Sequence, residues 1–78
     1  MLYYYVGCKN ESGTKKLTVT GPYPTTEAAV ADVERVRVAT EALFPNDQMF
    51  HWYQWVASHS ETRVEGQLND KLGFVPEL

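Results

Sequence analysis

Both tryptophans of the chain lie in one stretch, Met49-Phe50-His51-Trp52-Tyr53-Gln54-Trp55-Val56-Ala57. Aromatic and β-branched residues favour a pleated, half-buried backbone, and turn-forming polar residues stand on both sides of the stretch. The pattern therefore predicts a β-strand over residues 49–57. Alternation gives the strand two faces, Phe50, Trp52, Gln54, Val56 and Met49, His51, Tyr53, Trp55, Ala57. Because both faces are largely apolar, we expect either a strand between two layers or a sheet that keeps one face for a partner.

Length and composition indicate a single compact domain, residues 1–78. Hydrophobic residues make up 44% of the chain and charged residues 22%, which argues against intrinsic disorder. The net charge of −3 disfavours a binder of duplex nucleic acid, which relies on clustered Lys and Arg, and favours basic protein partners. Cys8 is the single cysteine, so no internal disulfide can form and a cytoplasmic location is expected. No membrane span is expected, because no apolar run approaches about 18 residues.

The N-terminal part of the chain predicts a β-hairpin. Its strands cover residues 2–9 and 15–20, and the polar residues between them, which include Gly13, suit a hairpin turn. Alternation in both strands predicts that one face of the hairpin lies in the core. The residues of that face are Tyr4, Val6, Cys8, Leu17 and Val19.

A helix is expected after the prolines that end the second strand. Thr25 or Thr26 is a suitable N-cap, and apolar residues at helical spacing continue to about Leu43. The opposite side of this helix is expected to be acidic and is a second candidate binding surface, with two alternatives: carboxylates that mimic the phosphates of a nucleic acid, or an ordinary solvated helix face, which the two arginines within it favour. Its acidic residues are Glu27, Asp32, Glu34 and Glu41.

A fourth strand over residues 62–68 is predicted to pair with the strand at 49–57 across a short turn. Gly66 inside it indicates a bulge or a close backbone approach. The tail, residues 69–78, is expected to add a short edge strand or to lie across one end of the core. The predicted fold is α+β with the order β-β-α-β-β, a four-stranded and mostly antiparallel sheet with one helix packed on one face.

One helix covers one face of such a sheet, so the other face is expected to be open. Tyrosines and tryptophans with a few basic side chains are typical of protein-binding hot spots and of surfaces that stack single-stranded bases. The open face is therefore the first candidate binding surface. Its expected residues are Tyr3, Tyr5, Lys16, Trp52, Tyr53, Trp55 and Arg63, with Lys9 and Thr18 beside them.

Catalytic and metal-binding patterns are weak in this sequence. His51, His59 and Cys8 do not stand at a spacing typical of metal ligands, and Cys8 alternates with Val6 as a small buried residue does. No glycine-rich phosphate loop is present. We therefore expect no metal, no cofactor and no enzymatic activity.

The stretch Thr20-Gly21-Pro22-Tyr23-Pro24-Thr25-Thr26-Glu27-Ala28-Ala29 runs from a strand through a proline turn into a capped, alanine-rich helix. With the small size and mild acidity of the chain, it resembles small proteins of phages and other mobile elements, including anti-CRISPR proteins. This resemblance implies a non-enzymatic inhibitor that occludes a surface of a bacterial nucleic-acid-binding complex. Two alternatives remain open: a single-stranded nucleic-acid binder that uses the aromatic sheet face, and a structural homodimer.

Overall fold

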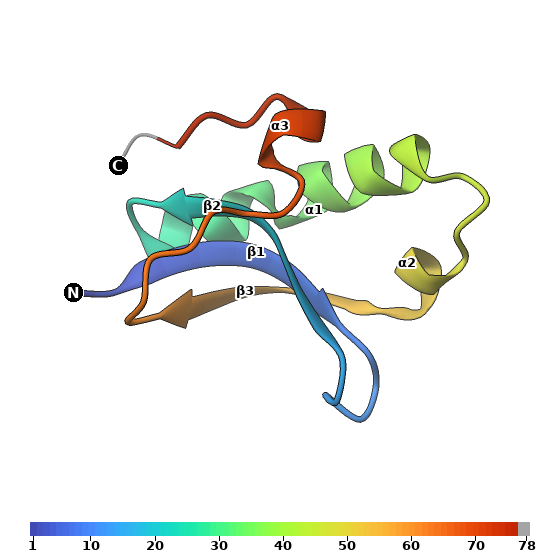
Figure 1. Ribbon diagram of the computed structural model, residues 1–78, viewed down its shortest axis with the longest axis horizontal. Helices are drawn as coiled ribbons and strands as arrows, with labels where there is room; N and C mark the ends of the chain where they lie inside the picture. Colours follow the sequence, from blue (N-terminus) through green and yellow to red (C-terminus); the bar gives the residue numbers. More distant parts are fainter. Residues whose placement is uncertain (77–78) are drawn as a thin grey trace.

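In the computed structural model, which describes residues 1–76, a three-stranded antiparallel sheet packs against one long helix (Figure 1). The sheet order is β2-β1-β3, so that β1 lies in the middle. The elements follow one another as β1 (Tyr3–Lys9), β2 (Lys16–Tyr23), α1 (Thr26–Leu43), α2 (Met49–Trp52), β3 (Gln54–Ser60) and α3 (Asn69–Leu72). The α+β class is confirmed, whereas the predicted set of four strands and one helix is wrong in detail.

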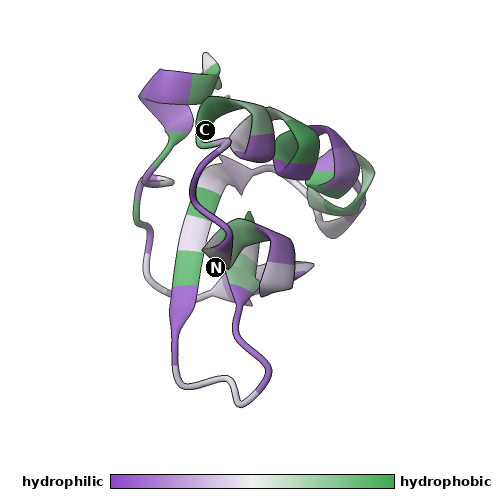
Figure 2. Cartoon of the chain, turned by 90° about the vertical axis from the view of Figure 1, so that its right-hand side faces the viewer, coloured by the Kyte–Doolittle hydropathy of each residue, from purple (hydrophilic) through white to green (hydrophobic). Residues whose placement is uncertain are grey.

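The core lies between the sheet and α1, as the alternation in the hairpin predicts. Val6 and Cys8 of β1 and Val19 of β2 are buried against Ala29 and Val36 of α1. Tyr4 and Leu17 pack against the same cluster and are partly buried. Hydrophobic and hydrophilic residues alternate along the strands and α1 (Figure 2). Burial of each large apolar side chain contributes about 1.5–3 kcal/mol to folding, so this cluster is the main source of stability.

Helix α1 has the ends that the sequence predicts. The Thr25 side chain accepts a hydrogen bond from the backbone N–H of Ala28 at 3.1 Å, which makes Thr25 the N-cap. The backbone N–H of Phe44 bonds to the carbonyl of Thr40 at 3.0 Å, and Pro45 then ends the helix.

The predicted strand over residues 49–57 is wrong in its first half. Residues 49–52 form the helical turn α2, and the strand β3 begins at Gln54 and continues to Ser60. The turn brings the Phe50 ring to 5.5 Å from the Phe44 ring and 6.2 Å from the Trp55 ring, measured between centroids. The indole N–H of Trp55 also donates to the carbonyl of Phe50 at 3.2 Å. Phe50 is 5% exposed, so this cluster of aromatic rings replaces the strand pairing that the pattern predicts.

The predicted fourth strand, residues 62–68, does not form and does not pair with β3. The chain leaves β3, crosses the sheet in front of β1 and reaches the outer edge of β2 (Figure 1). There the backbone N–H groups of Gly66, Gln67 and Leu68 donate to carbonyls of β2 at 3.2, 2.9 and 2.9 Å. We call residues 66–69 the C-terminal strap. Its consecutive backbone N–H groups donate to the β2 edge, as the free N–H groups of the first turn of a helix can, and the chain then continues into α3.

Gly66 fits the strap because a side chain has no room there. A Cβ atom at this position would lie 2.5 Å from the Cα of Thr20 and 2.5 Å from the Asn69 Oδ1 atom. The expected close backbone approach at Gly66 is therefore confirmed. The predicted tail corresponds in its described part to α3 and residues 73–76, and Phe74 packs on the Tyr23 ring with centroids 4.7 Å apart. Residues 77 and 78 lie outside the described residues.

Candidate protein-binding site

The open face of the sheet carries fewer free aromatic rings than the sequence predicts. Tyr3 is half-buried there, but Tyr5 is only 2% exposed, since its ring lies close to Gly21 of β2 and its hydroxyl bonds to the chain that crosses the sheet. The Tyr5 hydroxyl donates to the carbonyl of Thr62 at 3.3 Å and accepts from the N–H of Val64 at 2.9 Å. Arg63 lies in this covering segment and pairs with Glu65 at 2.9 Å. Tyr5 thus holds the crossing segment and presents no surface to a partner.

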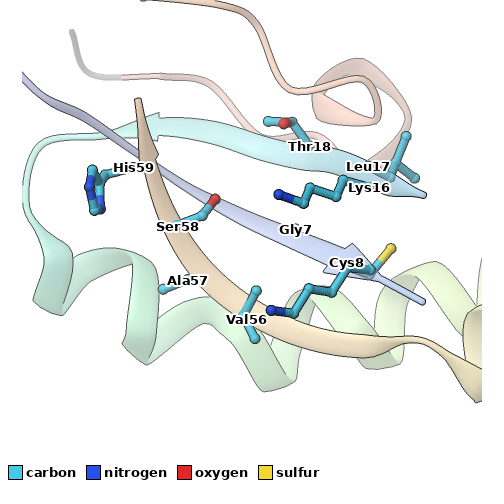
Figure 3. Close-up of a pocket in the computed structure, with 10 residues that line it drawn as sticks. Gly7, Cys8, Lys16, Leu17, Thr18, Val56, Ala57, Ser58 and His59 are labelled. Carbon is cyan, nitrogen blue, oxygen red and sulfur yellow. The ribbon is translucent and has the colours of Figure 1, made fainter. Parts of the chain in front are cut away.

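A shallow hollow of about 440 Å³ lies on the open face above Gly7. Thr18 and Lys16 of β2 and Val56 and Ser58 of β3 surround it (Figure 3). Lys9, which also lines the hollow, stands directly opposite Lys16 in the β1–β2 pairing. Within residues 1–76 no ion pair joins either lysine to a carboxylate. The hollow is therefore basic, and two lysines rather than aromatic rings define it.

The aromatic residues around β3 lie in three different places. Trp55 points to the α1 side and packs against the core, and Tyr53, between α2 and β3, also packs against the core. Trp52, in contrast, is 80% exposed at the end of α2. The predicted sheet-face set is therefore not assembled on one surface, and a platform of stacked rings from Tyr5 and the third strand is absent from the described residues.

Trp52 is an aromatic side chain that lies exposed on the surface. It lines a second hollow, of about 500 Å³, together with Pro45, Gln48 and His51. Leu43 at the end of α1 is 43% exposed nearby in the chain, and Pro45 is exposed. The imidazole Nδ1 of His51 lies 3.4 Å from the Glu41 carboxylate, so that α2 and α1 approach each other here. We call Pro45, Gln48, His51 and Trp52 the tryptophan knob.

The predicted acidic side of α1 is divided between two flanks, Asp32 on one and Glu34 and Glu41 on the other, and these carboxylates pair with arginines of the same helix. Arg35 binds Asp32 with two bonds of 2.6 Å, and Arg37 bonds to Glu34 and, at 2.9 Å, to Glu41. The Arg35 guanidinium is the main reason that the pKa of Asp32 is lowered, and the Arg37 guanidinium likewise lowers the pKa of Glu34. Glu27 is exposed in the first turn of α1. The arginines offset much of the negative charge of these carboxylates, so that the helix presents a surface of mixed charge rather than a row of free carboxylates.

The described residues contain no group of three or more His, Cys, Asp or Glu side chains that could hold a metal ion. Cys8 is buried, and its burial raises the pKa of its thiol to about 11. The thiol is therefore protonated at neutral pH, as expected for a residue that packs in the core. Among residues 1–76, no helix has both the length and the apolar character that crossing a membrane requires.

Comparison with known proteins gives no relative for this chain. Neither a protein-family profile, nor a curated protein sequence, nor a solved structure matches it.

Sequence reasoning identified Trp52 as a binding residue but placed it on the wrong element, and it did not include Pro45, Gln48 or His51 in the site. Gln48, His51 and Trp52 stand at positions i, i+3 and i+4, a spacing that puts side chains on one face of a helical turn. Pro45-Asn46-Asp47 before them is a signal for a turn followed by a new helix start. From this spacing the tryptophan knob could have been predicted in the sequence.

Proposed function

We propose that this chain is a non-enzymatic protein-binding module that docks through the tryptophan knob. The observation that carries the proposal is the 80% exposure of Trp52 in a small domain whose other tryptophan packs against the core. Tryptophan is the residue most enriched among binding hot spots, because a buried indole removes a large rigid apolar area from water at low entropic cost. The adjacent hollow and Pro45 give the partner a shaped surface around the ring.

A partner with a basic surface fits the negative net charge of this chain. The chain carries a net charge of −3, and Glu27 is an exposed carboxylate in the first turn of α1. Proteins that bind nucleic acids present such basic surfaces. We therefore propose the finer function of an inhibitor of the phage or mobile-element kind, anti-CRISPR-like, which occludes a surface of a bacterial nucleic-acid-binding complex.

The test begins with a photo-crosslinking amino acid at position 52, and with the same amino acid at position 75 as a control. Val75 is 81% exposed, so both probes are accessible to solvent. A partner captured through position 52 alone is purified, and its affinity is measured for the wild type, Trp52→Ala and Val75→Ala. Because an indole at a hot spot contributes at least about 2 kcal/mol, Trp52→Ala should lower the affinity at least about 30-fold, and Val75→Ala should not change it.

Two outcomes would count against the proposal. Equal affinity of Trp52→Ala and wild type would remove the knob from the interface. A captured complex that still binds its nucleic acid when saturated with this protein would refute the inhibitory function. Loss of folding does not confuse the result, because substitution of a side chain this exposed changes the free energy of unfolding by about 0.5 kcal/mol or less, which thermal melting verifies.

A further inference from the structure

The two edges of the sheet differ in how they are protected. The C-terminal strap donates three backbone hydrogen bonds to the outer edge of β2. The outer edge of β3 receives no backbone hydrogen bond from another segment within residues 1–76, since β3 pairs with β1 alone. A bare strand edge displays unpaired N–H and C=O groups, and proteins normally blunt it with charges, prolines or bulges.

Strand β3 lacks all three of these devices. Its sequence, Gln54-Trp55-Val56-Ala57-Ser58-His59-Ser60, contains no Lys, Arg, Asp, Glu or Pro. Its pairing with β1 runs without a register shift over seven residue pairs, so no bulge twists the edge away. An uncharged, unbroken edge of this length is a template for one more strand.

We propose that the occupant of this edge is β3 of a second copy of the chain, in an antiparallel pair with Ala57 on the two-fold axis. This register places Trp55 opposite His59 and Val56 opposite Ser58 of the second copy. Both pairs lie on matching faces, because residues 55, 57 and 59 face α1 while 56 and 58 face the open side. No like charges stand opposite each other, which is the usual obstacle to pairing a strand with itself.

The strap explains why such pairing stops at two copies. Each copy has one bare edge and one covered edge, so a two-fold pair uses both bare edges and leaves only covered ones. A chain with two bare edges would instead continue into a fibre. The resulting six-stranded sheet would have the order β2-β1-β3-β3-β1-β2, with both α1 helices on the same face.

Helix α1 adds to the proposed interface. Tyr23 of β2 holds Asp32, which fixes that flank of α1 above β2. At 100° per residue, Val30 and Arg37 lie on the opposite flank and therefore on the β3 side. Val30 is 57% exposed, and Arg37 lies between Glu34 and Glu41. Two such helices related by the two-fold axis would present apolar and mixed-charge side chains to each other, without a surplus of like charge at one point.

Sedimentation equilibrium tests the dimer, with loading concentrations from about 1 to about 300 μM, a range in which an interface of modest area passes from dissociated to associated. The wild type should move from a mass of 8.9 kDa toward twice that value. A mass that stays at 8.9 kDa at every concentration would overturn the proposal.

Disulfide trapping tests the register in a Cys8→Ala background. Ala57→Cys places two cysteines directly opposite each other, with Cα atoms about 4.5–5.5 Å apart and within reach of a disulfide. Gln54→Cys is the matched control, because its two copies would be about 20 Å apart at 3.4 Å per residue. Oxidation should cross-link Ala57→Cys at least about tenfold faster, and equal or reversed rates would overturn the pairing.

Trp52→Ala separates this inference from the proposed function. The dimer should persist in that variant, because residue 52 lies outside β3. Loss of the dimer in Trp52→Ala would instead assign the tryptophan knob to self-association. That result would contradict both the edge-pairing scheme and the docking of a foreign partner through Trp52.

Discussion

Asn69 pairs with the backbone of Gly21 as a second peptide group would. The N–H of Gly21 donates to the Asn69 Oδ1 atom at 3.1 Å, and the Asn69 Nδ2 group donates to the carbonyl of Gly21 at 2.6 Å. Asn69 is 6% exposed, so neither bond is exchanged readily for water. This reciprocal pair attaches the strap to β2 with a side chain where a strand would use its backbone.

Replacing Asn69 by Asp should destabilise the fold by about 2–3 kcal/mol near neutral pH, because a buried carboxylate cannot donate to the Gly21 carbonyl. The loss should shrink in acid, where a protonated carboxyl recovers a donor. Urea denaturation followed by tryptophan fluorescence measures both values. Asn46→Asp, at an exposed loop position, is the matched control and should change the free energy of unfolding by less than about 0.5 kcal/mol. Equal stability of the two variants would show that the Asn69 pair does not hold the strap.

Tyr23 should make stability sensitive to alkaline pH. Its hydroxyl donates to Asp32 at 2.6 Å and lies 2.8 Å from the Thr20 hydroxyl, and burial, followed by the bond to Asp32, raises its pKa. The folded chain thus keeps the proton more tightly than the unfolded chain, whose tyrosines titrate near pH 10. The stabilisation is complete below about pH 10 and is lost as the pH rises above it.

Asp32 should produce the opposite dependence in acid. Its pKa is lowered, chiefly by Arg35, so its contribution to stability is present above about pH 4 and is lost as the pH falls below that value.

Tyr23→Phe should cost about 1–3 kcal/mol at pH 7, because it leaves Thr20 without its partner, and it should flatten the alkaline side of the stability profile. Denaturation midpoints between pH 3 and pH 11 measure this, with Tyr3→Phe as the control. An unchanged alkaline slope in Tyr23→Phe would contradict the assignment.

Thr40 offers a stabilising substitution. Its side chain is fully buried in α1, and its hydroxyl has no hydrogen-bond partner among the described residues. Thr40→Val keeps the shape and removes an unsatisfied polar group, so it should stabilise the fold by about 1 kcal/mol and raise Tm by about 4–8 °C. Thr20→Val is the matched control, because the equally buried Thr20 hydroxyl bonds to Tyr23 and its loss should be destabilising. If both substitutions changed the free energy of unfolding in the same direction, the interpretation of Thr40 as an unsatisfied polar group would be wrong.

Most of the hairpin and α1 could be predicted because their signals are local, although β2 continues through Pro22 to Tyr23, past the end at Thr20 that the prolines predict. Alternation around Val6 and Val19, the Thr25 cap and the apolar stripe through Ala29 and Val36 all lie within single elements and agree with one another. Phe50 could not be placed in this way. Its contacts with Phe44 and Trp55 decide that residues 49–52 turn, and aromatic propensity alone favours a strand at the same positions.

The binding surface was predicted only in part for a related reason. Alternation places Tyr5 on the open face correctly, but it carries no information about a segment 57 residues away that bonds to its hydroxyl. Trp52 is exposed because it follows Phe50 on a helical turn rather than on a strand, where the two would share a face. Exposure of a side chain depends on what lies over it, and a periodic pattern within one element does not record that.

The C-terminal strap also sets how late the protein can finish folding. Gly21 and Asn69 are 48 residues apart in the chain, so the β2 edge has no cover until these distant segments meet. Contacts this distant in sequence form late and slowly, since the loop between them must close first. A chain in which the strap has not yet docked therefore exposes a three-stranded sheet whose two edges, β2 and β3, are both bare. We expect aggregation to begin from chains in which the strap has not yet docked.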